Sequence, residues 1–392
     1  MRSMPYPSAS PLLLVLLLTT AIPGLAATCS RADDAAQAAA DLQILVDLFK
    51  SYETAMNEGD PPRAREAAAR LFEKEQAPWV QVLVARACAA AGDHDEAFRE
   101  LSAAIDAIAG DPTRVDPMVL HLSKELEAGD DWEPLRADPR FPALLARARA
   151  GTWKPEALDF DGAPSERPPR APRPQIDAEA LRTLREAYDL DAVIAGATDD
   201  LDRVRRMCRW VHGRTSHQGW DDALPSDALG LLQVAEKGAQ WRCVEYGIVV
   251  SECLAAVGIP ARTVGGRARD VETIAFGAGH VFAEAWLDDL SRWVFIDPQE
   301  DIVGVDIDGT PMNSAEFRNS LASPDPPIPY PPGLALCLHF FTTSFGTADG
   351  SRSSVMLGPV GSTTPTKFQR RPTAAPDLFT HRLADFYAPP AP

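Results

Sequence analysis

Hydrophobic and polar residues follow two different periods along this chain, and each period predicts a different kind of structure. From about residue 33 to residue 151, apolar residues recur with the 3.6-residue period of amphipathic helices, among many Ala, Leu and Glu residues. After residue 260, short runs rich in Val, Phe, Ile and Trp indicate strands, above all at 281–287 and 292–296. We therefore expect a helical N-terminal part, followed by a part that contains a sheet.

Small and apolar residues recur in one stretch of the helical part, at Ala85, Cys88, Gly92, Ala97, Leu101 and Ala104. This stretch resembles a tetratricopeptide repeat, in which two helices pack closely through small residues. Such repeats need neighbours that cover their apolar faces, so two or three units are expected. A plain helical bundle would give the same periodicity and is the alternative interpretation.

Proline content and periodicity divide the rest of the chain. Residues 153–175 are rich in proline, which predicts an extended linker. The expected organisation is a helical tetratricopeptide-like domain at 28–152, this linker, a catalytic domain at 176–320 and a strand-rich extension and tail at 321–392. Within the extension, 324–332 is a Pro-rich loop, 334–345 and 353–360 are predicted strands, and 374–392 is predicted to be irregular.

A thiol, an imidazole and a carboxylate follow one another as Cys243, His280 and Asp297. The run 243–257 is mostly apolar and lacks proline, and Gly258 follows it, so Cys243 is predicted in the first turn of a buried helix. The positive end of the helix dipole and an adjacent imidazole both favour a thiolate there. Cys243 is therefore the candidate nucleophile.

The predicted hairpin brings the other two residues together. Residues 288–291 form a plausible turn, and closing the hairpin at Leu287 and Arg292 places Phe282 opposite Asp297. His280 is then diagonal to Asp297 on the same face, because side chains alternate along a strand. A slip of one residue would separate the two. The ordered set predicts a catalytic triad in which His280 is the general base and Asp297 orients it.

Four residues near the triad have candidate supporting roles. Gln240 and Trp241 enter the helix and carry side-chain donors, so either could stabilise an oxyanion together with the backbone N–H of Cys243. Each could equally belong to a packed loop. Glu245 suits the positive end of the helix dipole, and Arg262 is expected to pair with an acidic neighbour, so we expect both to support the fold.

The stretch from about Leu201 to Asp301 contains an ordered series of motifs: Trp210-Val211-His212, residues 226–232, Trp241-Arg242-Cys243-Val244-Glu245-Tyr246, residues 258–262, residues 277–281 and Trp293-Val294-Phe295-Ile296-Asp297. With these motifs the stretch resembles the transglutaminase-like superfamily, whose core is papain-like. The resemblance implies an α+β fold, with a buried helix packed on an antiparallel sheet and a Cys243–His280–Asp297 triad. Arg242 stands where animal transglutaminases have a small residue, so the chain is more similar to bacterial members.

Composition excludes several other classes of function. The net charge of −18 without basic clusters argues against nucleic acids and anionic lipid surfaces as partners. The sequence has no CxxC pair and no HExxH pattern, so neither a zinc site nor another cofactor is expected. Cys243 and Cys253 lie too far apart on one helix to form a disulfide.

The N-terminus predicts export from the cytoplasm. Residues 1–27 contain Arg2, an apolar run at 12–18 and small residues at 24–27, which together are typical of a secretory signal peptide. The apolar run is too short to span a membrane. We therefore expect a periplasmic or secreted protein; a lipid anchor at Cys29 is the less favoured alternative.

These features predict a secreted thiol enzyme that attacks a carboxamide or peptide carbonyl and forms a thioester at Cys243. Water would resolve the thioester in a cysteine protease or amidase, and an amine would resolve it in a transglutaminase. The resemblance to bacterial members favours hydrolysis of a protein or peptide substrate. The alternative is a non-catalytic adaptor whose helical repeats bind a protein partner and whose transglutaminase fold serves as a scaffold. The complete triad favours the enzyme.

Overall fold

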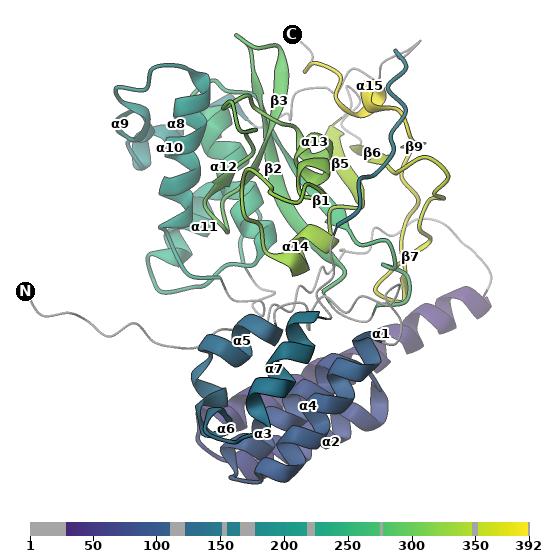
Figure 1. The fold of residues 1–392 in the computed structure, drawn as a ribbon. Helices are drawn as coiled ribbons and strands as arrows, with labels where there is room; N and C mark the ends of the chain where they lie inside the picture. The colour runs from purple at the N-terminus through teal and green to yellow at the C-terminus, as the bar shows by residue number, and fades with distance from the viewer. Residues whose placement is uncertain are drawn as a thin grey trace, which may run out of the picture.

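The structure is a computed structural model that describes residues 29–109, 122–150, 155–164, 177–217, 224–274, 277–346 and 352–390. The predicted signal peptide at 1–27 lies outside these residues, and the predicted linker at 153–175 is described only at 155–164. Figure 1 shows a group of helices, α1–α7, beside a larger part that contains the sheet. Among the described residues, no helix is both long and apolar enough to cross a membrane.

The helical part has its own hydrophobic core. Its elements are α1 (Cys29–Asn57), α2 (Pro61–Lys74), α3 (Pro78–Ala90), α4 (His94–Ala109), α5 (Leu122–Ala128), a 3-10 turn at Asp130–Trp132, α6 (Glu133–Arg136) and α7 (Phe141–Ala150). Gly92, with φ of 78°, makes the turn between α3 and α4. The other positions singled out in the sequence, among them Ala85 and Ala97, are fully buried where α3 and α4 pack together.

The larger part combines helices with a seven-stranded sheet. Its helices are α8 (Ala178–Ala187), α9 (Leu190–Ile194), α10 (Asp200–His212), α11 (Ala228–Ala235), α12 (Cys243–Ala256), α13 (Ser314–Ser320), α14 (Pro332–Leu336) and α15 (Leu383–Phe386). Its strands are β1 (Ala261–Arg267), β2 (Gly279–Leu287), β3 (Arg292–Asp297), β4 (Ile302–Val303), β5 (Phe340–Gly346), β6 (Arg352–Leu357) and β9 (Leu378–Thr380).

The strand order is β4-β3-β2-β1-β5-β6-β9, and every pair is antiparallel except β6 with β9. A separate two-stranded ribbon joins β7 (Lys367–Phe368) to β8 (Arg371–Pro372). The α+β fold with an N-terminal helical region is therefore as predicted.

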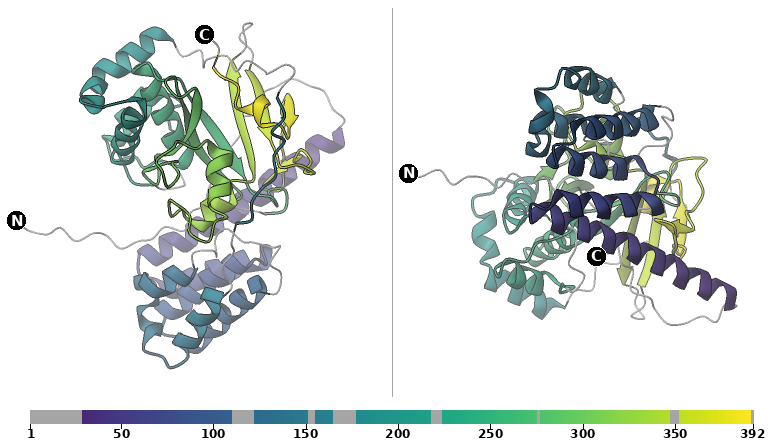
Figure 2. Two further views of the ribbon diagram at one scale, coloured as in Figure 1. Left: turned by 45° about the horizontal axis from the view of Figure 1, so that its top comes forward. Right: turned by 90° about the horizontal axis from the view of Figure 1, so that it is seen from below.

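Each face of the sheet is covered by a different set of elements. Helices α8–α12 lie on one face, where Ala283 and Ala285 of β2 join their core. On the other face Phe282 packs with Phe295 and with residues of α13, α14 and the C-terminal segment. The left view of Figure 2 shows this arrangement, with the sheet between the two sets. The alternation along β2 thus places Phe282 on the face opposite to Ala283 and Ala285.

Two predictions about the C-terminal part were wrong in detail. Residues 332–336 form helix α14, whereas a strand had been predicted from 334. Consecutive prolines at 331 and 332 explain this, because proline presets the backbone angle of a first helical turn. Residues after 374, predicted to be irregular, include β9 and α15. The other predicted strand, at 353–360, is present as β6 and joins the sheet, as does β5.

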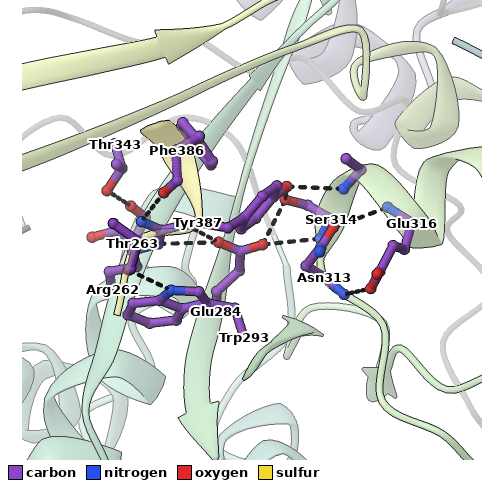
Figure 3. A network of polar contacts seen from close by, with 12 residues as sticks. Arg262, Thr263, Glu284, Trp293, Asn313, Ser314, Glu316, Thr343, Phe386 and Tyr387 are labelled. Carbon is purple, nitrogen blue, oxygen red and sulfur yellow. Dashed lines mark hydrogen bonds and ion pairs between the residues drawn. The ribbon is translucent and has the colours of Figure 1, made fainter. Parts of the chain in front are cut away.

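A buried ion pair ties the C-terminal segment to the sheet (Figure 3). Arg262 of β1 pairs with Glu284 of β2, with Nη2 2.6 Å from Oε2, so the prediction of an acidic neighbour for Arg262 is confirmed. Arg262 also donates to the carbonyl of Phe386 at 2.9 Å, and Glu284 accepts the backbone N–H of Ser314 at 2.9 Å. Tyr387 donates to or accepts from the hydroxyl of Ser314. The pair therefore sits at the junction of four segments.

The described part of the proline-rich segment is bound to the sheet-containing part. Leu158 donates its backbone N–H to Asn319 at 2.8 Å, and Asp161 donates its own to the carbonyl of His381 at 2.8 Å. The ring of Phe160 lies 6.2 Å from that of Phe341, measured between centroids. At 155–164 the chain is thus packed on the core.

The helical part contacts the core through the ribbon of β7 and β8. Glu75, which follows α2 and is buried, forms an ion pair with Arg370, whose Nη2 lies 2.7 Å from Oε1. Arg370 also donates from Nε to the carbonyl of Thr273 at 2.8 Å. The neighbouring Phe368 fills the space beside Gly279, where an added Cβ atom would lie 2.7 Å from its ring. Gly279 is the first residue of β2 and directly precedes His280.

Candidate active site

Cys243 lies where the sequence predicted it, at the first position of α12. Glu245, in the first turn of α12, caps the start of the helix. Its carboxylate accepts the backbone N–H of Arg242 at 2.9 Å and pairs with the Arg242 guanidinium. Cys243 is fully buried and packs against Val281. Its backbone N–H is among those that a helix leaves without an intrahelical acceptor. Glu245 thus supports the helix end, as expected.

The hairpin has the predicted register, with Leu287 opposite Arg292 and Ala283 opposite Ile296. This register brings the side chains of His280 and Asp297 together, and Nε2 of His280 lies 2.8 Å from Oδ2 of Asp297. Both residues are fully buried. A carboxylate at Nε2 leaves Nδ1 as the ring atom that is available for another group.

The surroundings of His280 favour its protonated form. Burial alone would lower its pKa, but the charge of Asp297 and the hydrogen bond to it outweigh burial, and the pKa is raised to about 10. The thiol of Cys243 adds to this rise, which places the sulfur near the imidazole. Nδ1 of His280 has no nitrogen or oxygen partner in the described part of the chain, so the Cys243 sulfur is the group that it faces. The arrangement can therefore hold a proton on the imidazole next to the sulfur.

The family model of the transglutaminase-like superfamily matches residues 189–298. This region is a transglutaminase-like domain. The matched residues run from the start of α9 to the end of β3, and they include Cys243, His280 and Asp297. The resemblance seen in the sequence is thereby confirmed.

Two solved structures are similar to parts of the chain. A candidate cysteine protease from Cytophaga hutchinsonii is 14% identical, with a TM-score of 0.25, over 39% of this chain and 49% of its own. The transglutaminase of red sea bream is 15% identical, with a TM-score of 0.25, over 45% of this chain and 34% of its own. This chain thus spans about half of the first protein and about a third of the second. A search of curated proteins gave no match.

The Asp297 carboxylate of the transglutaminase-like domain is held from two further sides. The backbone N–H of Gln299 donates to Oδ1 at 3.1 Å, and the hydroxyl of Tyr330 donates to Oδ2 at 2.6 Å. Tyr330 was not among the residues singled out in the sequence. It lies beyond the matched region, in the loop that was described only as Pro-rich.

The two oxyanion candidates differ in their surroundings. Gln240 donates its amide N–H to the hydroxyl of Ser216, so this donor already has an acceptor. Trp241 is fully buried and stacks edge-on against Tyr246, and its indole Nε1 has no partner within the described residues. Of the two candidates, Trp241 therefore keeps the donor that remains available.

A second imidazole lies near His280 and Asp297 and was missed in the sequence. His217 forms a backbone bridge with Trp241, and its Nε2 is buried with no partner among the residues that the structure describes. Its pKa is lowered to about 4 by burial and then by the charge of His280, while Asp297 opposes the shift. His217 is thus neutral at pH 7. A lone histidine without a periodic context gives no signal that would have identified it.

The remaining described thiols lie in environments that keep them protonated. Burial raises the pKa of Cys88, Cys208, Cys253 and Cys337. Cys253 is on α12, as Cys243 is, but near the other end of the helix and away from any imidazole partner of the triad. No group of three or more potential metal-ligating side chains occurs in the described ranges.

Proposed function

We propose that this chain is a thiol enzyme that cleaves amide or peptide bonds through a thioester at Cys243. The observation that carries the proposal is the buried His280–Asp297 pair at the start of helix α12. The pKa of His280 is raised, and its Nδ1 atom faces the thiol of Cys243. A thiol is a weak nucleophile until its proton is removed, and this pair is suited to accept it. The match to the transglutaminase-like superfamily supports the same chemistry.

The steps follow from these positions. Nδ1 of His280 holds the proton taken from the thiol, so Sγ of Cys243 attacks the carbonyl carbon as a thiolate. The tetrahedral intermediate collapses as the C–N bond breaks, and His280 returns the proton to the leaving amine. Water then attacks the thioester, His280 takes a proton from it, and the acid product leaves as the thiol is restored. Asp297 stabilises the imidazolium throughout. The backbone N–H of Cys243 and the indole of Trp241 are the proposed donors to the oxyanion.

Water is the acceptor that we favour, which makes the chain a cysteine protease or amidase. Arg242 replaces the small residue that animal transglutaminases carry before the nucleophile, and its guanidinium is held by Glu245. We further propose that the substrate is a protein or peptide and that the helical part recruits a protein partner through its repeats. The signal-like residues 1–27 support a periplasmic or secreted location.

Covalent labelling tests the proposed function. The purified full chain is treated with iodoacetamide at pH 7, and the modified cysteines are mapped by mass spectrometry. Cys243 should react at least ten times faster than Cys253, whose pKa is raised by burial on the same helix. The Cys243→Ala variant should lose cleavage of a small peptide amide, and Cys253→Ala is the matched control that should keep it.

The acceptor is tested with the same peptide amide in the presence of a fluorescent primary amine. Release of the free acid with little amine incorporation is expected for a protease or amidase. Dominant incorporation would instead show a transglutaminase. A folded wild-type protein in which Cys243 reacts no faster than Cys253 would reject the enzyme and favour the adaptor.

A further inference from the structure

Tyr330 is the only described residue outside β2 and β3 whose side chain is shown bonded to the Asp297 carboxylate. Its hydroxyl donates to Oδ2 at 2.6 Å, and Oδ2 is also the atom that faces Nε2 of His280 at 2.8 Å. One carboxylate oxygen thus receives two donors from different segments of the chain. Such a short contact to a charged acceptor is typical of a strong, charge-assisted hydrogen bond.

The ring of Tyr330 is held firmly in this position. Its centroid lies 5.2 Å from that of Phe317, at an interplanar angle of 87°, and 5.9 Å from that of Phe295, at 81°. Prolines at 329 and 331 flank the residue and restrict the backbone on both sides. Burial raises the pKa of the hydroxyl well above its ordinary value, with Asp297 adding to the rise. The hydroxyl therefore stays protonated and remains a donor through the neutral range.

One other bond constrains the carboxylate. Oδ1 accepts the backbone N–H of Gln299 at 3.1 Å, so the terminal torsion of Asp297 is set jointly by this bond and by what binds Oδ2. His280 cannot fix this torsion of Asp297 alone, because its imidazole must also exchange a proton with Cys243. A rigid donor that belongs to neither His280 nor Cys243 can fix it.

We propose that Tyr330 is a positioning residue for the reaction proposed above, which holds Oδ2 of Asp297 toward Nε2 of His280. The inference rests on the proposed function for its role in catalysis, but its effect on the His280–Asp297 pair is independent of any substrate. Without the hydroxyl, the carboxylate turns away from the imidazole, and the imidazolium loses part of the charge that stabilises it.

The test is the Tyr330→Phe variant, with Tyr387→Phe as the matched control. Tyr387 is partly buried, as Tyr330 is, and its hydroxyl bonds to Ser314 and to the backbone N–H of Ala315, away from His280 and Asp297. The pKa of His280 is measured by NMR of the full-length protein, with the signal assigned from a His280→Gln variant. Removing Tyr330's hydroxyl should lower this pKa by about one pH unit, whereas the control should leave it unchanged.

The titration must be interpreted with the other ionisable groups near His280 in mind. These are Asp297 on β3, Cys243 on α12, His217 before the α11 segment and Glu300 after β3. All four are the same in both variants, so the difference between the variants reports the lost hydroxyl. A second readout is the iodoacetamide reaction of Cys243 at pH 7, which should slow several-fold in Tyr330→Phe and not in the control.

Two results would overturn the inference. An unchanged His280 pKa in folded Tyr330→Phe would show that the hydroxyl has no positioning role. A raised pKa would show that Tyr330 only competes with His280 for Oδ2. Failure of the proposed function looks different: Cys243 of the wild type would be unreactive, while Tyr330→Phe would still lower the pKa of His280.

Discussion

The buried ion pair between Arg262 and Glu284 should be among the costliest places to perturb this protein. The change that isolates its charge is Arg262→Met, because methionine keeps the length of the side chain and its contact with the rings of Trp293 and Phe386. Those rings lie 4.1 Å and 4.7 Å from the guanidinium carbon of Arg262. The variant leaves Glu284, which is fully buried, without its cation.

The size of the effect follows from burial. Removing one partner of a buried pair leaves an uncompensated charge and costs about 3–5 kcal/mol. The carbonyl of Phe386 also loses its donor, which adds about 1 kcal/mol. The backbone N–H and hydroxyl of Ser314 still bind Glu284 and limit the loss. We therefore expect Arg262→Met to lower the free energy of unfolding by about 4 kcal/mol, or the melting temperature of the core by roughly 10 °C.

Calorimetric unfolding of single and double variants tests this reasoning. The double variant Arg262→Met with Glu284→Gln removes the stranded charge, so it should be more stable than Arg262→Met alone. Arg182→Ala is the control, because Arg182 and its partner Glu179 are 63% and 64% exposed, and it should cost less than about 0.5 kcal/mol. A double variant no more stable than Arg262→Met would refute the idea that an uncompensated charge dominates the loss.

Three further predictions concern pH, packing and the extent of the core. Burial, followed by the charges of nearby arginines, lowers the pKa of His339 to about 4, so the unfolded chain binds more protons than the folded one between about pH 6.5 and 4. Stability should therefore fall over that window as pH falls, and His339→Gln should flatten the slope in urea titrations. Gly279→Ala should slow alkylation of Cys243, because the added methyl group meets the ring of Phe368. A second change of Phe368→Leu should restore part of the rate, and no restoration would argue against this clash. A chain that begins at residue 155 should melt at a higher temperature than one that begins at residue 176, since only the longer one keeps Phe160 on the core; equal melting temperatures would contradict this.

Regular structure around the site could be predicted because its signals are local. The turn at 288–291 and the two-residue period of the flanking strands determine the register that brings His280 to Asp297. The start of α12 is marked by the loop before Cys243, and its end by Gly258, which has a φ of 88°. Both features depend on residues that are close in sequence, so a single chain carries the information.

Contacts between irregular segments could not be predicted in this way. Tyr330 reaches Asp297 across 33 residues from a loop without periodicity, and Arg370 reaches Glu75 across 295 residues. Nothing in the composition of either loop indicates a partner. The start of α14 was misjudged for a related reason, because an apolar run of this length is compatible with a strand or with a short helix.

The ion pair between Glu75 and Arg370 offers a physical route for thermodynamic linkage between the two parts of the chain. Arg370 is held to the helical part on one side, and its neighbour Phe368 rests on Gly279, next to His280, on the other. A ligand of the helical part and a ligand of the candidate active site that each prefer one position of this ribbon would alter each other's affinity by the same factor. Partner binding measured with free and with covalently blocked Cys243 would give the size of that reciprocal effect.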